Sequence, residues 1–119
     1  MTSGPAPRLR PRLRVTRADE ILLGPGKADL LDAVRRRGSL RAAARELGMS
    51  YMRAWSLVRT MNGAFREPLV AASRGGAGHG GATLTLTGAR VLALYRAMES
   101  ASLTATAADW RRLSRLLKR

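Results

Sequence analysis

The residues best suited to chemistry lie in a glycine-rich stretch past the middle of the chain. Residues 73–87 read SRGGAGHGGATLTLT, and residues 76–81 have the G-x-G-x-x-G spacing of a dinucleotide-binding loop. Such a loop cradles phosphate only where a strand precedes it and a helix opens directly after it. Residues 82–86 instead alternate apolar with small or polar side chains, as a strand does. We therefore predict two strands, at residues 68–72 and 82–86, joined by a glycine-rich tip.

The sequence lacks the residues that other common active sites need. It has no cysteine and one histidine, His79, so neither a thiolate metal site nor Ser-His-Asp catalysis can be assembled. The Gly26-Lys27 pair is followed by Ala28 instead of the Ser or Thr of a phosphate loop. The eight acidic residues are scattered, mostly among arginines. We expect no enzymatic activity, no cofactor and no bound metal.

The charge of the chain indicates a polyanionic partner. Lys and Arg number 22 against 8 Asp and Glu, which gives a formal net charge of +14. A genome rich in G and C would favour arginine over lysine, but it would not produce the excess of basic over acidic residues. We therefore favour nucleic acid as the partner. No apolar run approaches the about 20 residues that span a bilayer, so we expect a cytoplasmic protein with no membrane contact.

The N-terminal segment is predicted to be irregular at first and then to form a strand. Residues 1–8 are rich in Pro, Gly and Ser and predict a disordered tail, which leaves residues 9–119 as one domain. Residues 8–17, RLRPRLRVTR, alternate arginine with apolar residues and predict an edge strand with one basic face. The apolar residues 21–23 then end in a turn.

Three short helices and one long helix are predicted in the rest of the chain. The short ones span residues 27–37, 40–47 and about 51–65, with Gly38 and Gly48 ending the first two and Ser39 and Ser50 capping the second and third. Thr87 is predicted to cap a long helix over residues 88–118, with a bend or break at residues 100–106. This order of elements predicts a mainly α fold with a small β-hairpin, a winged helix-turn-helix. The order is strand, helix, helix, tight turn, helix, hairpin and long helix.

The same region carries a family resemblance. Residues 38–62, GSLRAAARELGMSYMRAWSLVRTMN, and the later GGAGHGGATLTLTG resemble the N-terminal DNA-binding domain of the molybdate-responsive ModE-type regulators, a winged helix-turn-helix related to that of LysR-type regulators. The family pattern is G-S-(I/L)-x-x-A-A, then G-(I/M)-S-Y-x-x-A-W, a Met-Asn pair, a glycine-rich wing and L-T-x-x-G. The resemblance implies DNA binding and dimerisation. Family members continue into a C-terminal molybdate-binding module, and because this sequence ends at Arg119 we expect the 119 residues not to bind molybdate.

The third short helix is expected to enter the major groove of DNA. At about 100° per residue, Ala54, Leu57, Val58, Met61 and Phe65 share one face, which we assign to the core. The opposite face carries candidates for reading bases or contacting phosphates: Met52, Ser56, Arg59 and Thr60, with Arg53 at its edge. Tyr51 and Trp55 lie on the rim between the faces, where packing is the favoured role.

Further DNA contacts are expected around this helix. Ser50 and the Tyr51 hydroxyl are placed to reach phosphates, as the resemblance suggests, and Ser39 and Arg41 begin the preceding helix. In the wing, which we expect to lie against the sugar-phosphate chain, Arg74 supplies charge and His79 a hydrogen bond. The alternative for each side chain is solvated surface, and for the wing a bare flexible loop.

These features predict a sequence-specific bacterial transcription regulator that binds an inverted-repeat operator as a homodimer. The predicted helix at residues 88–118 carries more apolar side chains than one small domain needs, although a monomer that packs them all remains the alternative. The sequence is also compatible with two other functions. One is a non-specific architectural DNA binder, and the other is an adaptor module for a separate sensor protein.

Overall fold

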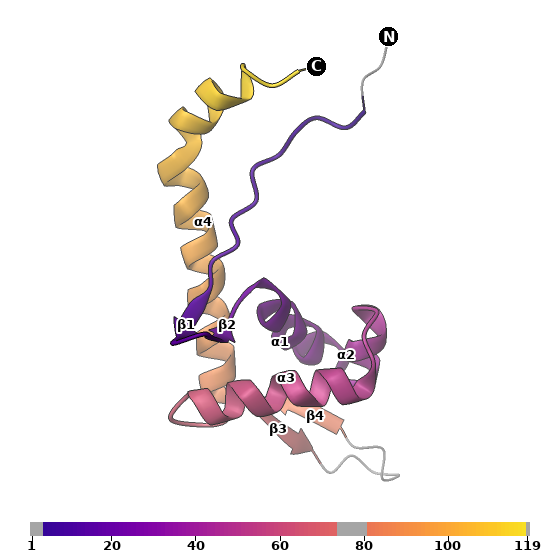
Figure 1. The fold of residues 1–119 in the computed structure, drawn as a ribbon. Helices are drawn as coiled ribbons and strands as arrows, with labels where there is room; N and C mark the ends of the chain where they lie inside the picture. Colours follow the sequence, from indigo (N-terminus) through magenta and orange to yellow (C-terminus); the bar gives the residue numbers. More distant parts are fainter. Residues whose placement is uncertain (1–3, 74–80, 119) are drawn as a thin grey trace.

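The computed structural model describes residues 4–73 and 81–118, and within them it is mainly helical (Figure 1). The elements in chain order are β1 (Val15–Arg17), β2 (Glu20–Leu23), α1 (Pro25–Arg37), α2 (Leu40–Glu46), α3 (Tyr51–Ala64), β3 (Val70–Ser73), β4 (Gly81–Leu84) and α4 (Leu86–Ser114). The strands form two antiparallel pairs, β1 with β2 and β3 with β4. This order confirms the predicted winged helix-turn-helix with a long C-terminal helix.

The helix boundaries around α2 follow from local side-chain chemistry. Gly38 ends α1 in the left-handed region, at φ 69°, and its amide donates to the Val34 carbonyl oxygen. The Ser39 hydroxyl accepts a hydrogen bond of 3.2 Å from the amide of Ala42 at the start of α2. The Ser50 hydroxyl does the same for Arg53 at the start of α3, at 3.1 Å. The predicted positions of these three caps are confirmed.

The start of α4 differs from the prediction. Thr85, and not Thr87, is the cap: its hydroxyl accepts from the Gly88 amide at 2.9 Å and donates to the Pro68 carbonyl oxygen at 2.6 Å. The Thr85 backbone is still extended, so its hydroxyl can face the amide three residues ahead, whereas Thr87 already lies within the first turn. The helix therefore begins at Leu86.

The predicted interruption of α4 at residues 100–106 is also wrong. The helix runs without a break from Leu86 to Ser114. Within the weak segment, the hydroxyls of Ser102 and Thr106 donate to backbone carbonyl oxygens four residues earlier, at 2.9 and 2.7 Å. These bonds satisfy the two hydroxyl protons within the helix, so the polar side chains are accommodated without a break.

The N-terminal strand is much shorter than predicted. Only Val15–Arg17 pairs with β2, and residues 8–14 lie outside the strand pairing. The partner β2 has four residues, and Pro11 has no amide to donate, so a longer ladder cannot form. The Tyr95 hydroxyl donates to the Leu13 carbonyl oxygen at 2.7 Å and holds this segment where it leaves the body. Residues 4–8 are exposed, and the disorder expected for the tail stays a prediction.

The core lies between α1, α2, α3, the β3–β4 hairpin and the first turns of α4. Its centre is α1, which buries Leu30, Leu31 and Val34 completely. Ala43 and Ala54 are fully buried on α2 and α3, and their small side chains let the two helices cross closely. From α4, Leu92 and Tyr95 complete the core.

The molecule is elongated because most of α4 projects from this core. The radius of gyration is 17.4 Å, whereas a compact chain of this length has about 13–14 Å. The buried residues of α4 are Gly88, Leu92 and Tyr95, all in its first three turns. Figure 1 shows the C-terminal half of α4, in yellow, extending well past the other elements. None of the helices in the described residues is both long and apolar enough to cross a membrane.

Candidate nucleic-acid interface

The two faces of α3 differ in burial as the sequence pattern predicts. Ala54, Val58 and Met61 are buried, whereas Leu57 and Phe65 are partly buried against the core. Most of the residues that we expected on the DNA side are exposed: Met52, Arg53, Ser56 and Arg59. Thr60, the remaining candidate, is half-buried. Met52 is 75% exposed, which is unusual for a large apolar side chain. The structure therefore presents a mixed polar and apolar face, with two arginines, to solvent.

Lys27 is a basic neighbour of this face that sequence reasoning missed. Its Nζ donates to the Ile21 carbonyl oxygen at 2.5 Å, which holds the side chain over β2. Burial lowers the pKa of Lys27, the nearby Glu20 opposes this shift, and the positive charge of Arg53 adds to it. The two cations therefore lie within electrostatic reach of each other. Only tertiary packing reveals this, because 26 positions separate them in the sequence.

Arg41, Tyr51 and Trp55 form a cluster at the N-terminal ends of α2 and α3. The Arg41 guanidinium carbon lies 4.5 Å from the centre of the Tyr51 ring. The Trp55 Nε1 donates a hydrogen bond of 2.9 Å to the Tyr51 hydroxyl oxygen, one helical turn away. Trp55 is 38% exposed, so its packing is incomplete. The spacing of Tyr51 and Trp55 could have indicated their contact, but the placement of Arg41 depends on how α2 crosses α3.

The β3–β4 hairpin is fixed to α3 and to the start of α2. The Asn62 side chain accepts hydrogen bonds from the amides of Leu69 and Val70, at 2.8 and 3.2 Å, and donates to the Val70 carbonyl oxygen at 3.0 Å. On the other strand, the Ala82 amide donates to the Gly38 carbonyl oxygen at 3.0 Å. The base of the wing is therefore held in a defined position beside α3. Arg74 and His79, the expected contacts at its tip, lie outside the described residues.

The serines at the two helix starts are already engaged as caps. The hydroxyl oxygens of Ser39 and Ser50 accept amide hydrogen bonds, so each keeps its own proton for a further acceptor. Ser50 is exposed and Ser39 half-buried. Arg41, in the first turn of α2, is exposed.

Several arginines elsewhere are engaged in ion pairs on α1 and α2. Glu46 of α2 accepts from Arg36 and Arg37 of α1, and Asp32 accepts from Arg35 and Arg36. Hydrogen bonds from Arg36, which contributes most, and from Arg37 lower the pKa of Glu46 to about 2. This network joins the two helices and neutralises part of their charge.

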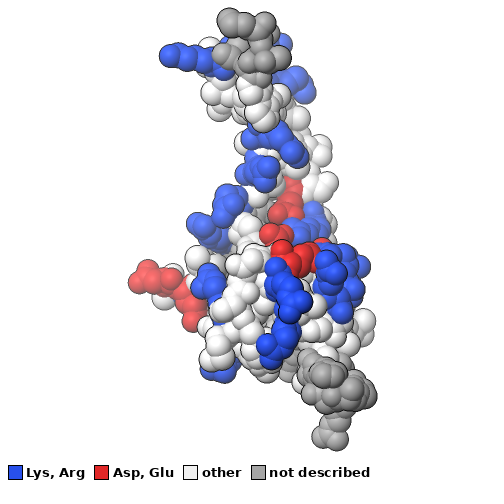
Figure 2. All heavy atoms as spheres, turned by 90° about the vertical axis from the view of Figure 1, so that its right-hand side faces the viewer, with Lys and Arg blue, Asp and Glu red and all other residues white. Residues whose placement is uncertain are grey.

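The arginines near α3 contrast with those of the network. No ion pair joins Arg41, Arg53 or Arg59 to an acidic group in the described part of the chain. Figure 2 shows basic side chains spread over the length of one side of the molecule, with the acidic ones confined to small groups. The charge around α3 is therefore available to an anionic partner.

The chain matches a known family over the elements just described. Residues 27–89, from α1 to the start of α4, match the family described as "Bacterial regulatory helix-turn-helix protein, lysR family". These residues include α2, α3 and the β3–β4 hairpin, which together form the helix-turn-helix and its wing.

Individual relatives show a more specific similarity. The chain is 45% identical over 78 residues to the molybdenum-pterin-binding protein MopB of Rhodobacter capsulatus, covering 66% of this chain and 29% of MopB. It is 46% identical over 70 residues to the molybdenum transport protein ModE of Azotobacter vinelandii, covering 59% and 26%. With the DNA-binding transcriptional dual regulator ModE of Escherichia coli K12 it shares 36% identity over 76 residues, covering 64% and 29%.

The chain thus spans less than a third of the length of each of these relatives. The predicted resemblance to the DNA-binding domain of ModE-type regulators is confirmed. Because the family match covers more than half of the chain and includes the complete helix-turn-helix, the protein belongs to the bacterial regulatory helix-turn-helix proteins of the lysR family.

Proposed function

We propose that the chain is the DNA-binding part of a transcription regulator that recognises an inverted-repeat operator as a homodimer. The observation that carries this proposal is the exposed face of α3, where Arg53 and Arg59 flank Met52 and Ser56 outside the ion-pair network. Arginine recognises guanine edges and phosphates, and an exposed methionine offers apolar contact to a thymine methyl group. Inserted in the major groove, α3 has the side chains to read sequence.

The residues around α3 are suited to fixing its position on the DNA backbone. Ser39 and Ser50 have hydroxyl protons to donate, while Arg41 and Tyr51 offer a charged and a neutral donor at the same end of the motif. We assign these four residues to phosphate contacts. We assign Arg74 and His79, near the tip of the wing, to the same role.

The apolar surface of α4 supports dimerisation. Tyr95 and Leu113 lie 18 positions apart, which is five full turns, so both face the same side of the helix. Tyr95 is buried in the core, whereas Leu113 is 52% exposed on the projecting half. Leu103, which is 41% exposed, lies between them in the sequence and about 80° around the helix. A second copy of the helix would cover this continuation of the core-facing stripe. Two-fold symmetry would then place two α3 helices about one DNA turn, 34–36 Å, apart.

Selection of bound fragments from random duplex DNA tests this function. We expect an enriched sequence made of two inverted half-sites whose centres are about one helical turn apart. Enrichment without any preferred sequence would favour the architectural alternative and would contradict the assignment of α3 to base reading. A single half-site without symmetry would contradict the dimer.

A further inference from the structure

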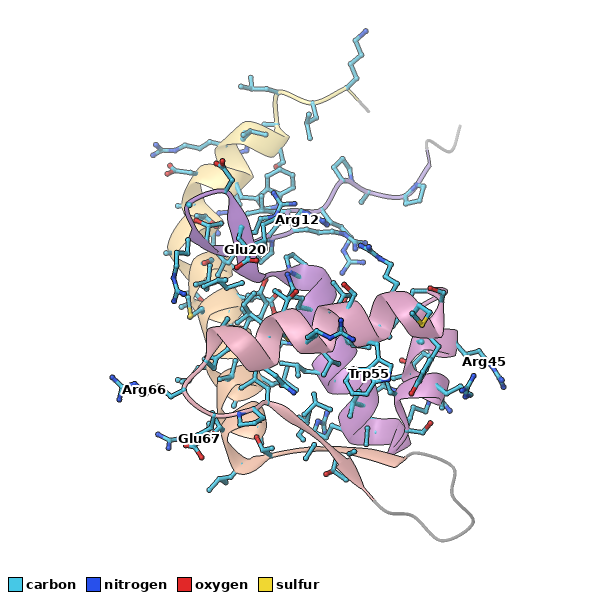
Figure 3. The ribbon with its side chains drawn as sticks, turned by 60° about the horizontal axis from the view of Figure 1, so that its bottom comes forward. Arg12, Glu20, Arg45, Trp55, Arg66 and Glu67 are labelled. Carbon is cyan, nitrogen blue, oxygen red and sulfur yellow. The ribbon has the colours of Figure 1, made fainter. Side chains whose placement is uncertain are left out.

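A small apolar cleft lies between α3 and the β3–β4 hairpin, beside the DNA-facing side of α3. Its volume is about 80 Å³, and its lining includes Leu40, Tyr51, Trp55, Val70, Ala72 and Ala82. Trp55 extends from α3 on the side of α2 and the hairpin (Figure 3). Because the indole is 38% exposed, part of it faces solvent in an otherwise apolar hollow.

Tyr51, which lines the cleft, and Arg41, which stacks on Tyr51, are two hydrogen-bond donors. The Tyr51 hydroxyl oxygen accepts from the Trp55 indole, so its own proton is free for another acceptor. The Arg41 guanidinium stacks 4.5 Å from the Tyr51 ring centre, an arrangement that leaves its N–H groups pointing outward around its edge. The cleft is therefore suited to a ligand with one weakly polar part, which fills the apolar hollow, and one anionic part, which accepts hydrogen bonds from Tyr51 and Arg41.

The path of a DNA strand explains why such a group would arrive there. A sugar-phosphate backbone separates each major groove from the neighbouring minor groove. In the proposed complex α3 occupies a major groove and the hairpin lies against the adjoining backbone, so that strand must pass between α3 and the hairpin. The base of the hairpin is fixed there by Asn62 and by the bond from Ala82 to Gly38, so the width of the passage is set before DNA binds.

We propose that this cleft binds one deoxyribose-phosphate unit of the DNA strand, with the sugar against Trp55 and the phosphate at Tyr51 and Arg41. The inference rests on the proposed DNA binding and adds a role for Trp55, for which packing was the favoured interpretation. A contact with the sugar carries no base identity, so it contributes affinity equally to every sequence. Trp55 therefore differs from Arg53 and Arg59, which we assign to base reading.

Hydroxyl-radical footprinting tests the sugar contact directly, because the radical attacks deoxyribose. On an operator obtained by selection, the wild-type chain is expected to protect a short run of sugars on the strand between α3 and the wing. Trp55→Ala is expected to lose protection of those sugars while other protected positions remain. Its affinity should fall about tenfold for operator and random duplex alike, since several tens of Å² of indole surface no longer become buried.

Matched variants separate this contact from a folding defect. Trp55→Phe keeps an aromatic wall, so it should retain most of the sugar protection. Leu86→Ala removes an apolar side chain that is 80% exposed outside the cleft, and it should change neither footprint nor affinity. Circular dichroism and thermal unfolding establish that each variant is folded.

The outcomes distinguish the inference from the function on which it rests. Unchanged sugar protection by a folded Trp55→Ala chain, with wild-type affinity, would overturn the inference while DNA binding stands. A loss confined to the operator would mean that Trp55 reads a base, and it would overturn the sugar contact. Failure of the wild-type chain to bind any duplex would overturn both proposals.

Discussion

Gly88 lies directly against Leu69, so closely that a Cβ atom added to the glycine would come within 2.1 Å of the Leu69 carbonyl oxygen. The same oxygen accepts a hydrogen bond of 3.0 Å from the Thr85 amide. The contact brings the first turn of α4 onto the residue that precedes β3. It therefore determines how the long helix leaves the winged body.

Gly88→Ala is expected to destabilise the protein by about 1–3 kcal/mol or more, because the backbone at Leu69 cannot yield like a flexible side chain. Urea unfolding measures the change. Gly63→Ala on α3 is the matched control, since its added Cβ would have nothing within 4 Å beyond its chain neighbours and the backbone of its own helix. Alanine should stabilise that helical position by about 0.5–1 kcal/mol. Equal effects of the two substitutions would refute the close approach.

Asn62→Ala should loosen the wing from α3. The substitution leaves the half-buried Leu69 and Val70 amides without the side-chain acceptor, at a cost of about 1–3 kcal/mol. Hydrogen exchange at these two amides should accelerate beyond what the global loss of stability explains. Asn62→Asp, which keeps the acceptor oxygen, should affect them less. Unchanged exchange in the alanine variant would show that the hairpin is held in place by other contacts.

Acid should weaken the connection between α1 and α2. The arginines lower the pKa of Glu46 from 4.5 to about 2, so its contribution to stability is complete above pH 4.5 and is lost as the pH falls towards 2. The difference in melting temperature between the wild type and Glu46→Gln should therefore be constant near neutrality and should shrink within that window. A difference that does not change between pH 6 and pH 2 would contradict the ion pairing of Glu46 with Arg36 and Arg37.

Local chemistry made the central elements predictable from sequence. Ser39, Ser50 and Gly38 have the side chains or backbone freedom that helix ends need. Apolar residues that recur every three or four positions mark the buried face of α3. These signals act over a few residues, so they can be read without the fold. They located α3 and its two faces.

The missed features depend on contacts between distant residues. Thr87 is the predicted cap of α4, whereas the contact of Thr85 with Pro68 and Leu69, distant in the sequence, places Thr85 in that position. The strand predicted at residues 8–17 is longer than the observed β1, because the length of β1 is set by its partner β2. The contact of Trp55 with Tyr51 could be expected from their spacing on one helix, but the cleft beside them needed the position of the hairpin.

Leu113→Arg should convert the proposed dimer to a monomer, because it places a charge on the exposed stripe that continues from Tyr95. Leu94→Arg, at a side chain that is 62% exposed, is expected to do the same if the interface extends around α4. Thr104→Arg is the control, since it lies on the helix face opposite Tyr95. Light scattering at tens of micromolar measures the mass. A wild-type monomer with full operator affinity would refute the proposal.

We propose that the exposed face of α3 reads DNA sequence, and a titration of Arg59→Ala on two duplexes tests this most directly. At constant salt, the variant should lose about 1–3 kcal/mol of binding free energy on the selected operator and far less on a scrambled duplex. Arg53→Ala should behave in the same way if it also contacts bases. Operator affinity equal to that of the wild type in both variants would contradict the assignment of α3 to base recognition.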